Sequence, residues 1–304
     1  MPENNIKDYL HLHLIVFIWG FTAILGALIS IDAIPLVWYR MLLASIFIAI
    51  YFLIKRKSFQ IDKKGLLKFL LTGAIIALHW ITFFKAIKVS NVSVALVTMS
   101  TGAFFTSLIE PFFFKRKIKI QEIILGLLVI LGLYIIFNFE SQYTLGIVYA
   151  LISASLSSLF SVLNGLYIKK YKADTISLYQ LFFGALCISI YLLFAGKFSI
   201  EFFQLSTLDW VFIGILSSIC TAYAFIISVK VMKHLTPYTV VLTLNLEPVY
   251  AIILALIIFG EKEKMNTEFY IGALIVLLVV LLNGILKNKD KIKQKIQAKR
   301  RAKN

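Results

Sequence analysis

The chain has few charged residues and few cysteines. Only 15% of its 304 residues are charged and two are cysteines, whereas a soluble domain carries about 25% charged residues. Cys187 and Cys220 both lie inside apolar segments, without the spacing of metal ligands. We interpret them as small hydrophobic residues. The low charge argues against a soluble globular protein, and the cysteines predict no metal site.

Motifs for enzymatic chemistry are also missing from the sequence. There is no P-loop, no H-E-x-x-H, no G-x-S-x-G and no pair of aspartates inside an apolar segment. The sequence therefore predicts no cofactor and no enzyme, and without a nucleotide-binding domain the chain alone cannot drive transport with ATP. An uncoupled channel or facilitator stays open as an alternative, although no selectivity-filter repeat or ring of like charges occurs. The other alternative is an intramembrane enzyme that acts on a lipid-linked substrate through His79 and Glu247.

Long apolar runs make up most of the sequence. The chain is 60% hydrophobic with a mean hydropathy of +0.90, and its runs have the roughly 20-residue length that a helix needs to cross a bilayer. The sequence thus predicts an all-α integral membrane protein with ten transmembrane helices. Their expected ranges are 9–30, 34–54, 66–87, 91–114, 120–138, 145–168, 175–195, 209–230, 236–260 and 268–286.

The net charge of +16 is concentrated at the ends of these runs and in the tail 287–304, "KNKDKIKQKIQAKRRAKN". We expect this basic tail to contact anionic lipid headgroups rather than nucleic acid. Most Lys and Arg residues fall on the side of the membrane where the N-terminus lies, so the positive-inside rule predicts that both termini are cytoplasmic. The first apolar run has no cleavage site after it and is predicted to be a retained helix of a multi-pass protein in the cytoplasmic (inner) membrane.

The two halves of the sequence resemble each other. "YRMLLASIFIAIYFLI" from Tyr39 aligns with "YQLFFGALCISIYLLF" from Tyr179, 140 residues later, and the fourth and ninth predicted helices align at a spacing near 145. Two blocks in one order favour an internal duplication, with repeats at 9–138 and 145–286. Five helices are an odd number, so the second repeat would be inverted in the membrane, as in many secondary transporters.

The chain resembles the EamA-like branch of the drug/metabolite transporter superfamily. The resemblance rests on the two sets of five helices, on "FIWGFTAI" in the first helix, on Pro35 to Arg40, and on "LEPVYAIILALIIFGE" from Leu246 to Glu261. In the first repeat this last motif is degraded, because Ala103 stands opposite Pro248 and Arg116 opposite Glu261. The resemblance implies a carrier, or an exporter, of small organic solutes such as amino acids or metabolites. It leaves open both proton coupling and the choice between monomer and homodimer.

Glu247 is the most unusual residue of the predicted spans. It lies roughly 16 Å along its helix at 1.5 Å per residue, where a charge costs about 3 kcal/mol. One interpretation places it in a substrate or proton site that faces a cavity. The other is structural, with a protonated acid that hydrogen-bonds the backbone freed by Pro248, which is expected to bend the helix.

Arg40 and its repeat equivalent Gln180 are a second polar pair, predicted to share an inward face. Arg40 could bind an anionic or zwitterionic solute through its planar fork; the alternative, which the sequence slightly favours, is snorkelling to the interface or pairing with Asp32. His79 is expected to line a cavity, with a proton relay as a further possibility, or to be a neutral histidine that a Ser or Thr satisfies across a helix interface. The remaining cavity candidates are Trp19, Trp80, Ser100, Tyr223 and Asn245.

Overall fold

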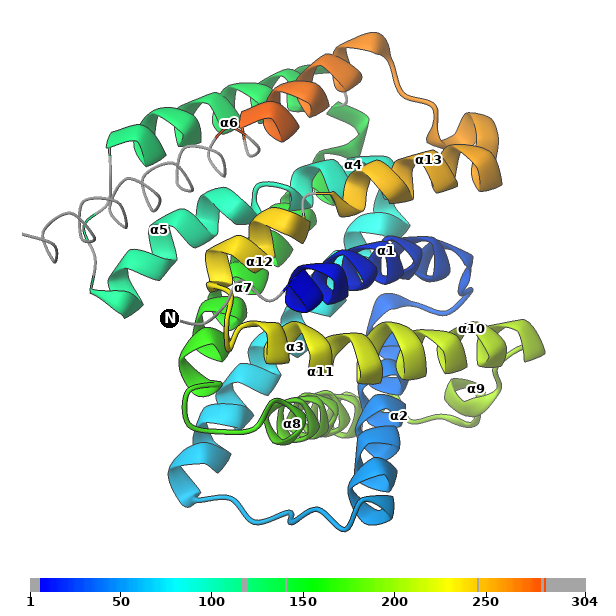
Figure 1. Ribbon diagram of the computed structural model, residues 1–304. Helices are drawn as coiled ribbons and strands as arrows, with labels where there is room; N and C mark the ends of the chain where they lie inside the picture. Colours follow the sequence, from blue (N-terminus) through cyan, green and yellow to red (C-terminus); the bar gives the residue numbers. More distant parts are fainter. Residues whose placement is uncertain are drawn as a thin grey trace, which may run out of the picture.

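The computed structural model describes residues 6–115, 117, 120–139, 141–244, 246–279 and 282. These residues form helices and connecting loops and contain no strand. Figure 1 shows the helices packed side by side in a bundle; we call the end at which the first helix begins the N-terminal end. The tail 287–304 and its predicted lipid contacts lie outside the described residues.

The first half of the chain contains the helices α1 to α6. Their bounds are α1 Ile6–Leu28, α2 Ala33–Ile54, α3 Lys63–Val89, α4 Val92–Met99, α5 Gly102–Phe114 and α6 Ile120–Phe139. The second half begins with the 3-10 turn η1, Ser141–Tyr143, and the helices α7 Thr144–Tyr167, α8 Ala173–Phe194 and the short α9 Ile200–Phe203. Next come α10 Thr207–Ser217, the π-helical segment η2 Ser218–Tyr223, α11 Ala224–Val231, α12 Pro237–Leu244, α13 Glu247–Phe259, the 3-10 turn η3 Gly260–Glu263 and a helix at Thr267–Val279.

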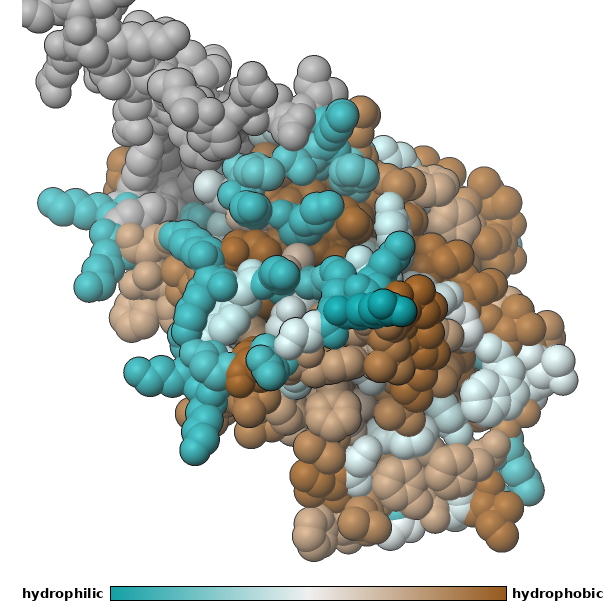
Figure 2. Space-filling view, turned by 60° about the horizontal axis from the view of Figure 1, so that its bottom comes forward, coloured by the Kyte–Doolittle hydropathy of each residue, from teal (hydrophilic) through white to brown (hydrophobic). Residues whose placement is uncertain are grey.

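Eight helical segments in the described part are long and apolar enough to cross a membrane. The two remaining predicted spans, 120–138 and 268–286, overlap the shorter apolar helical stretches Ile124–Ile136 and Thr267–Val279. The outer surface is also apolar: Leu53, Phe112 and Phe194 are 66%, 81% and 87% exposed. Figure 2 shows hydrophobic side chains over much of one face, with hydrophilic ones gathered in a band across it. Such a surface is unsuited to water and suits lipid.

Two predicted helices, 91–114 and 236–260, are each interrupted in the middle. The first is divided into α4 and α5 after Met99, and the second into α12 and α13 after Leu244. The two breaks lie 145 residues apart, the spacing at which the halves align. Pro248, at which the sequence predicts a bend, occupies the first turn of α13, directly after the second break.

The break in the first half occurs without a proline. The hydroxyl of Ser100 donates to the Leu96 carbonyl at 3.2 Å, and that of Thr101 donates to the Thr98 carbonyl at 2.7 Å. These side chains bind carbonyls next to the position where the regular helix ends, and Ser and Thr hydroxyls that bond back in this way are known to bend helices. In addition, Ser158 of α7 donates to the Gly102 carbonyl at 2.7 Å.

The end of the bundle opposite the N-terminus is tied together by two buried carboxylates. Asp209, at the start of α10, accepts hydrogen bonds from the backbone N–H and the hydroxyl of Ser30, at 2.7 and 2.6 Å. Glu263 of η3 accepts from the backbone N–H groups of Val92 and Ser93, both at 2.9 Å, and from the Ser93 hydroxyl at 2.8 Å. Each carboxylate joins one half of the chain to the other, and we call the pair the carboxylate latches.

The N-terminal end of the bundle is held by more exposed ion pairs. Lys57 pairs with Asp174, and Asp62 accepts from Lys170 at 2.6 Å and from the Tyr171 hydroxyl at 2.8 Å. These two donors lower the pKa of Asp62 to about 2. The pairs join the loop before α3 to the start of α8 and to the loop before it. The exposed pair of Lys170 and Asp62 contributes little to stability.

Candidate functional site

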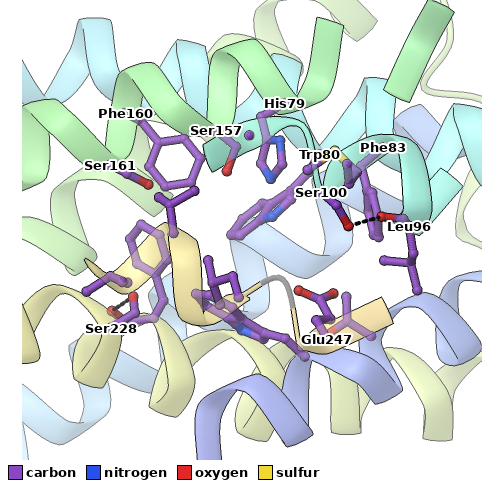
Figure 3. A pocket seen from close by; sticks show the side chains of 18 of the residues that line it. His79, Trp80, Phe83, Leu96, Ser100, Ser157, Phe160, Ser161, Ser228 and Glu247 are labelled. Atoms are coloured by element: carbon purple, nitrogen blue, oxygen red, sulfur yellow. Dashed lines mark hydrogen bonds between the residues drawn. The ribbon is translucent and has the colours of Figure 1, made fainter. Parts of the chain in front are cut away.

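A cavity of about 90 Å³ lies inside the bundle, between the two helix breaks. It has room for several water molecules or a small solute. The following residues line it: Trp19, Thr22, Arg40, His79, Trp80, Phe83, Leu96, Met99, Ser100, Gly102, Ser157, Phe160, Ser161, Asn164, Phe225, Ser228, Met232, Val240, Val241, Leu244, Glu247 and Pro248. Figure 3 shows many of these side chains converging on one space from helices of both halves.

The cavity extends toward the N-terminal end of the bundle. Asn164 lies in the last turn of α7 and Met232 directly follows α11, and both helices end on that side. At the opposite end of the bundle, the carboxylate latches described above join the two halves of the chain.

Glu247 lies in the first turn of α13, at the second helix break. Figure 3 shows its carboxyl group pointing across the cavity toward Trp80 and Ser100. Among the described residues it forms no ion pair and accepts no hydrogen bond. A helix N-terminus also favours a negative charge through the helix dipole. Glu247 is thus placed to meet a solute or a proton.

Arg40 is buried, with 1% of its side chain exposed. Its Nε donates to the Thr221 hydroxyl at 2.7 Å, and its guanidinium carbon lies 3.8 Å from the centre of the Trp80 ring. The snorkelling and the Asp32 pairing expected from the sequence are therefore wrong: Asp32 is exposed, whereas Arg40 points inward. The cation–π contact supplies part of the interaction that a buried guanidinium needs.

The π-helical segment η2 positions two of the lining residues. Thr221 holds Arg40, and the carbonyl of Cys220 accepts a hydrogen bond from the indole of Trp19 at 2.9 Å. A π-helix widens the turn and frees carbonyl groups from the regular helical pattern, and such segments are frequent at functional sites. The unusual backbone of η2 therefore orients side chains of α1 and α2.

His79 lies on α3, and its Nδ1 is 3.0 Å from the Ser153 carbonyl and 2.8 Å from the Ser153 hydroxyl. A carbonyl only accepts hydrogen bonds, so Nδ1 carries the proton and Nε2 is the acceptor. The ring is thus hydrogen-bonded to a serine across a helix interface and also lines the cavity. Ser100 and Trp80 line the cavity as well.

Three sequence candidates do not reach the cavity lining or cannot be placed. Gln180 is fully buried and donates to Asn164 at 2.7 Å, so it touches the cavity only through that residue. Tyr223 does not line the cavity, and its side chain is 42% exposed. Asn245 lies outside the described residues.

The polar stripe of α7 was not among the predicted site residues. Ser157, Ser161 and Asn164 line the cavity at spacings of four and three residues, which is the repeat of one helix face. That spacing was visible in "SASLSSLFSVLNG", a stretch whose small residues favour close helix packing. The stretch both lines the cavity and packs against other helices, because Ser153 and Ser158 of α7 donate hydrogen bonds to carbonyls of neighbouring helices.

The described lining is aromatic and apolar, with Arg40, His79 and Glu247 as its ionisable residues. A few polar groups in a mostly apolar wall are typical of a small-molecule site. Within the described residues, no group of three His, Cys, Asp or Glu side chains is placed to hold a metal ion. A helical multi-pass bundle with such a cavity at two helix breaks has the architecture of a membrane transporter.

Comparison with known proteins identifies the family. The model of the EamA-like transporter family matches residues 7–138 and 144–285, and the chain belongs to this family. The predicted resemblance is thereby confirmed, and the protein is a membrane transporter.

Two curated relatives carry only general names. An "Uncharacterized transporter" of Clostridium kluyveri is 26% identical over 202 residues, which cover 64% of this chain and 63% of the relative. The "Uncharacterized transporter YxxF" of Bacillus subtilis is 21% identical over 244 residues, covering 78% and 76%. A solved structure titled "Crystal structure of protein" has a TM-score of 0.67 at 14% identity and covers 93% of this chain and 98% of its own. That likeness concerns the fold alone.

Proposed function

We propose that the protein is a secondary transporter that exports small organic solutes across the cytoplasmic membrane by alternating access. The observation that carries this proposal is the cavity between two helix breaks 145 residues apart. Breaks at equivalent positions, together with the two matches of the family model, support ten spans arranged as two inverted five-helix repeats. Related halves can exchange conformations, which supplies two states of similar energy.

The sidedness follows from the positive charges. The loops at the N-terminal end of the bundle carry most of the Lys and Arg residues, so we place this end in the cytoplasm. The cavity then extends toward the cytoplasm while the carboxylate latches join the two halves of the chain at the outer end. This arrangement corresponds to an inward-facing or occluded state of the transport cycle.

The transport function is tested with purified protein in liposomes. We expect saturable uptake of a small solute that is accelerated by unlabelled solute on the other side of the membrane. Linear flux without saturation or counterflow would contradict a carrier and favour a channel. Turnover of a lipid-linked substrate that is lost in His79→Ala would instead indicate an intramembrane enzyme.

We further propose that Glu247 couples transport to protons. In this interpretation Glu247→Gln, which removes the titrating group and keeps its size, makes transport independent of pH, whereas the wild type responds to pH. The measurement is initial uptake rate between about pH 5.5 and 8, with the yield of monodisperse protein as a control for folding. An unchanged pH profile combined with poor yield would show that Glu247 is structural.

A further inference from the structure

We propose that the cavity binds small organic carboxylates, whose carboxylate group is held by Arg40 and whose apolar body contacts the aromatic wall. The carboxylate would be the cargo of the transport function proposed above, on which this inference rests. The starting observation is an incomplete set of hydrogen bonds. Nη1 of Arg40 is buried and has no hydrogen-bond partner among the described residues, although Arg40 lines the cavity.

The orientation of the guanidinium is fixed by its other contacts. Nε is occupied by the Thr221 hydroxyl, and Trp80 covers one face of the group. Thr221 in turn donates to the Leu216 carbonyl at 2.6 Å, so its own position is fixed within η2. Of the remaining nitrogens, Nη1 has no partner among the described residues. Two parallel N–H groups of a guanidinium match the two oxygens of a carboxylate.

The charges in the cavity favour an anion with a single charge. Arg40 is the one arginine or lysine of the described lining, and Glu247 interacts with it electrostatically without forming an ion pair among the described contacts. With Glu247 protonated, a monocarboxylate would neutralise the buried guanidinium, which is costly to leave unpaired. A phosphate dianion would leave an excess negative charge in the cavity. One guanidinium group therefore suits a carboxylate better than a phosphate.

The rest of the lining suits an apolar body. The rings of Trp80 and Phe225 lie 5.9 Å apart, those of Phe160 and Phe225 lie 6.3 Å apart, and Phe83 completes this aromatic wall. Such rings pack against flat or branched hydrocarbon groups without needing hydrogen bonds. The class of solute is thus a carboxylate joined to a small apolar or aromatic group.

Pairs of ligands that differ only in a carboxylate or an amide group test whether the cavity selects carboxylates. Binding of benzoate against benzamide, and of butyrate against butyramide, is measured by titration calorimetry on the purified full-length chain at neutral pH. Because hydrogen bonds to a charged group are strong, we expect at least one carboxylate to bind about 10-fold or more tightly than its amide. Equal affinities within both pairs, or no binding of either carboxylate, would overturn the proposal.

Substitution of Arg40 tests whether this residue causes the preference for carboxylates. Arg40→Gln is expected to bring the carboxylate-to-amide ratio to about one, a loss of about 10-fold. Both ligands of a pair are measured on the same preparation, so the ratio does not depend on how much of the variant folds. Tyr223→Phe, on the same π-helical segment but outside the cavity lining, is the matched control and keeps the wild-type ratio. A ratio that Arg40→Gln leaves unchanged would contradict the assignment.

Thr221 is expected to act as a positioning residue. Thr221→Val retains the charge of Arg40 but removes the acceptor of its Nε, so we expect the ratio to fall several-fold and to stay above one. Thr221→Ser restores the acceptor and should restore the ratio. If Thr221→Val and Thr221→Ser behave alike, Thr221 does not orient Arg40.

The proposed transport function and the proposed preference for carboxylates can be disproved separately. If carboxylates bind in an Arg40-dependent way but no solute shows counterflow, the transport function is wrong and the binding site stands. If a neutral or cationic solute shows saturable counterflow while the carboxylate-to-amide ratio is near one, the carboxylate assignment is wrong and the transport function stands.

Discussion

Glu263→Ala is expected to destabilise the protein strongly, by about 2–5 kcal/mol, because it leaves two buried backbone donors without acceptors. The carboxylate accepts from the N–H groups of Val92 and Ser93, the first two residues of α4, and the Asn91 side chain accepts from Val94 at 2.8 Å. Together they satisfy the free donors of this helix start. Glu263 is 4% exposed, so water cannot simply replace it.

The chain provides a matched control two residues away. Glu261 is an acid of the same turn, but its side chain is 86% exposed and its contact is an ion pair with Lys264 at 3.3 Å. Glu261→Ala should therefore change stability by less than about 0.5 kcal/mol. Glu263→Gln keeps one acceptor oxygen and should lie between the two alanine variants. Thermal unfolding in detergent measures all three, and equal losses for Glu261→Ala and Glu263→Ala would show that the latch does not stabilise the fold.

Glu263 also joins the two halves of the chain at the end of the bundle opposite the N-terminal end. Weakening it should shift the population toward states in which that end is open. A cysteine introduced at Leu96, which lines the cavity and is 1% exposed, would then react faster with a membrane-impermeant thiol reagent in Glu263→Gln than in a variant with the same cysteine and the native Glu263. An unchanged rate would mean that the latch stabilises the fold without controlling access.

The membrane spans could be predicted from the sequence because hydrophobic length is a local property. A run of about 20 apolar residues identifies a helix in lipid whatever its neighbours are. The helix breaks were harder to predict, since Pro248 marks one of them but the break after Met99 depends on hydroxyls of Ser100 and Thr101 that bond within their own turn. Serine and threonine are also ordinary in continuous membrane helices, so they give no unambiguous signal.

The contacts of the site residues could not be predicted, because their partners lie far away in the sequence. Arg40 is 181 residues from Thr221, and the local sequence offered only Asp32 as a partner. In the same way the family motif drew attention to the exposed Glu261, whereas the buried acid is Glu263, whose partners are 170 and 171 residues away. Glu247 was recognised because an acid at mid-depth is unusual by itself.

Gly73→Ala is expected to be the second strongly destabilising change. A Cβ at Gly73 of α3 would lie 2.5 Å from the Gln180 carbonyl oxygen and 3.0 Å from the backbone nitrogen of Gly184, both in α8. A Cβ at Gly184 would lie 2.8 Å from the Gly73 carbonyl oxygen, so the two backbones are in direct contact. Backbone atoms cannot rotate away as a side chain does, and α3 and α8 would have to separate. Such overpacking costs about 1–3 kcal/mol, and more for Gly73→Leu.

The effect should reach the cavity, because His79 and Trp80 lie on α3 within two turns of Gly73. Separation of α3 from α8 would shift both rings, and we expect weaker solute binding as well as a lower unfolding temperature. Gly214→Ala is the matched control, since Gly214 is also helical but a Cβ added there would meet no atom within 4 Å. That variant should be as stable as the wild type or slightly more so, because alanine favours a helix by up to about 1 kcal/mol. If Gly73→Ala and Gly214→Ala unfold at the same temperature, α3 and α8 do not approach each other so closely that only glycine fits at position 73.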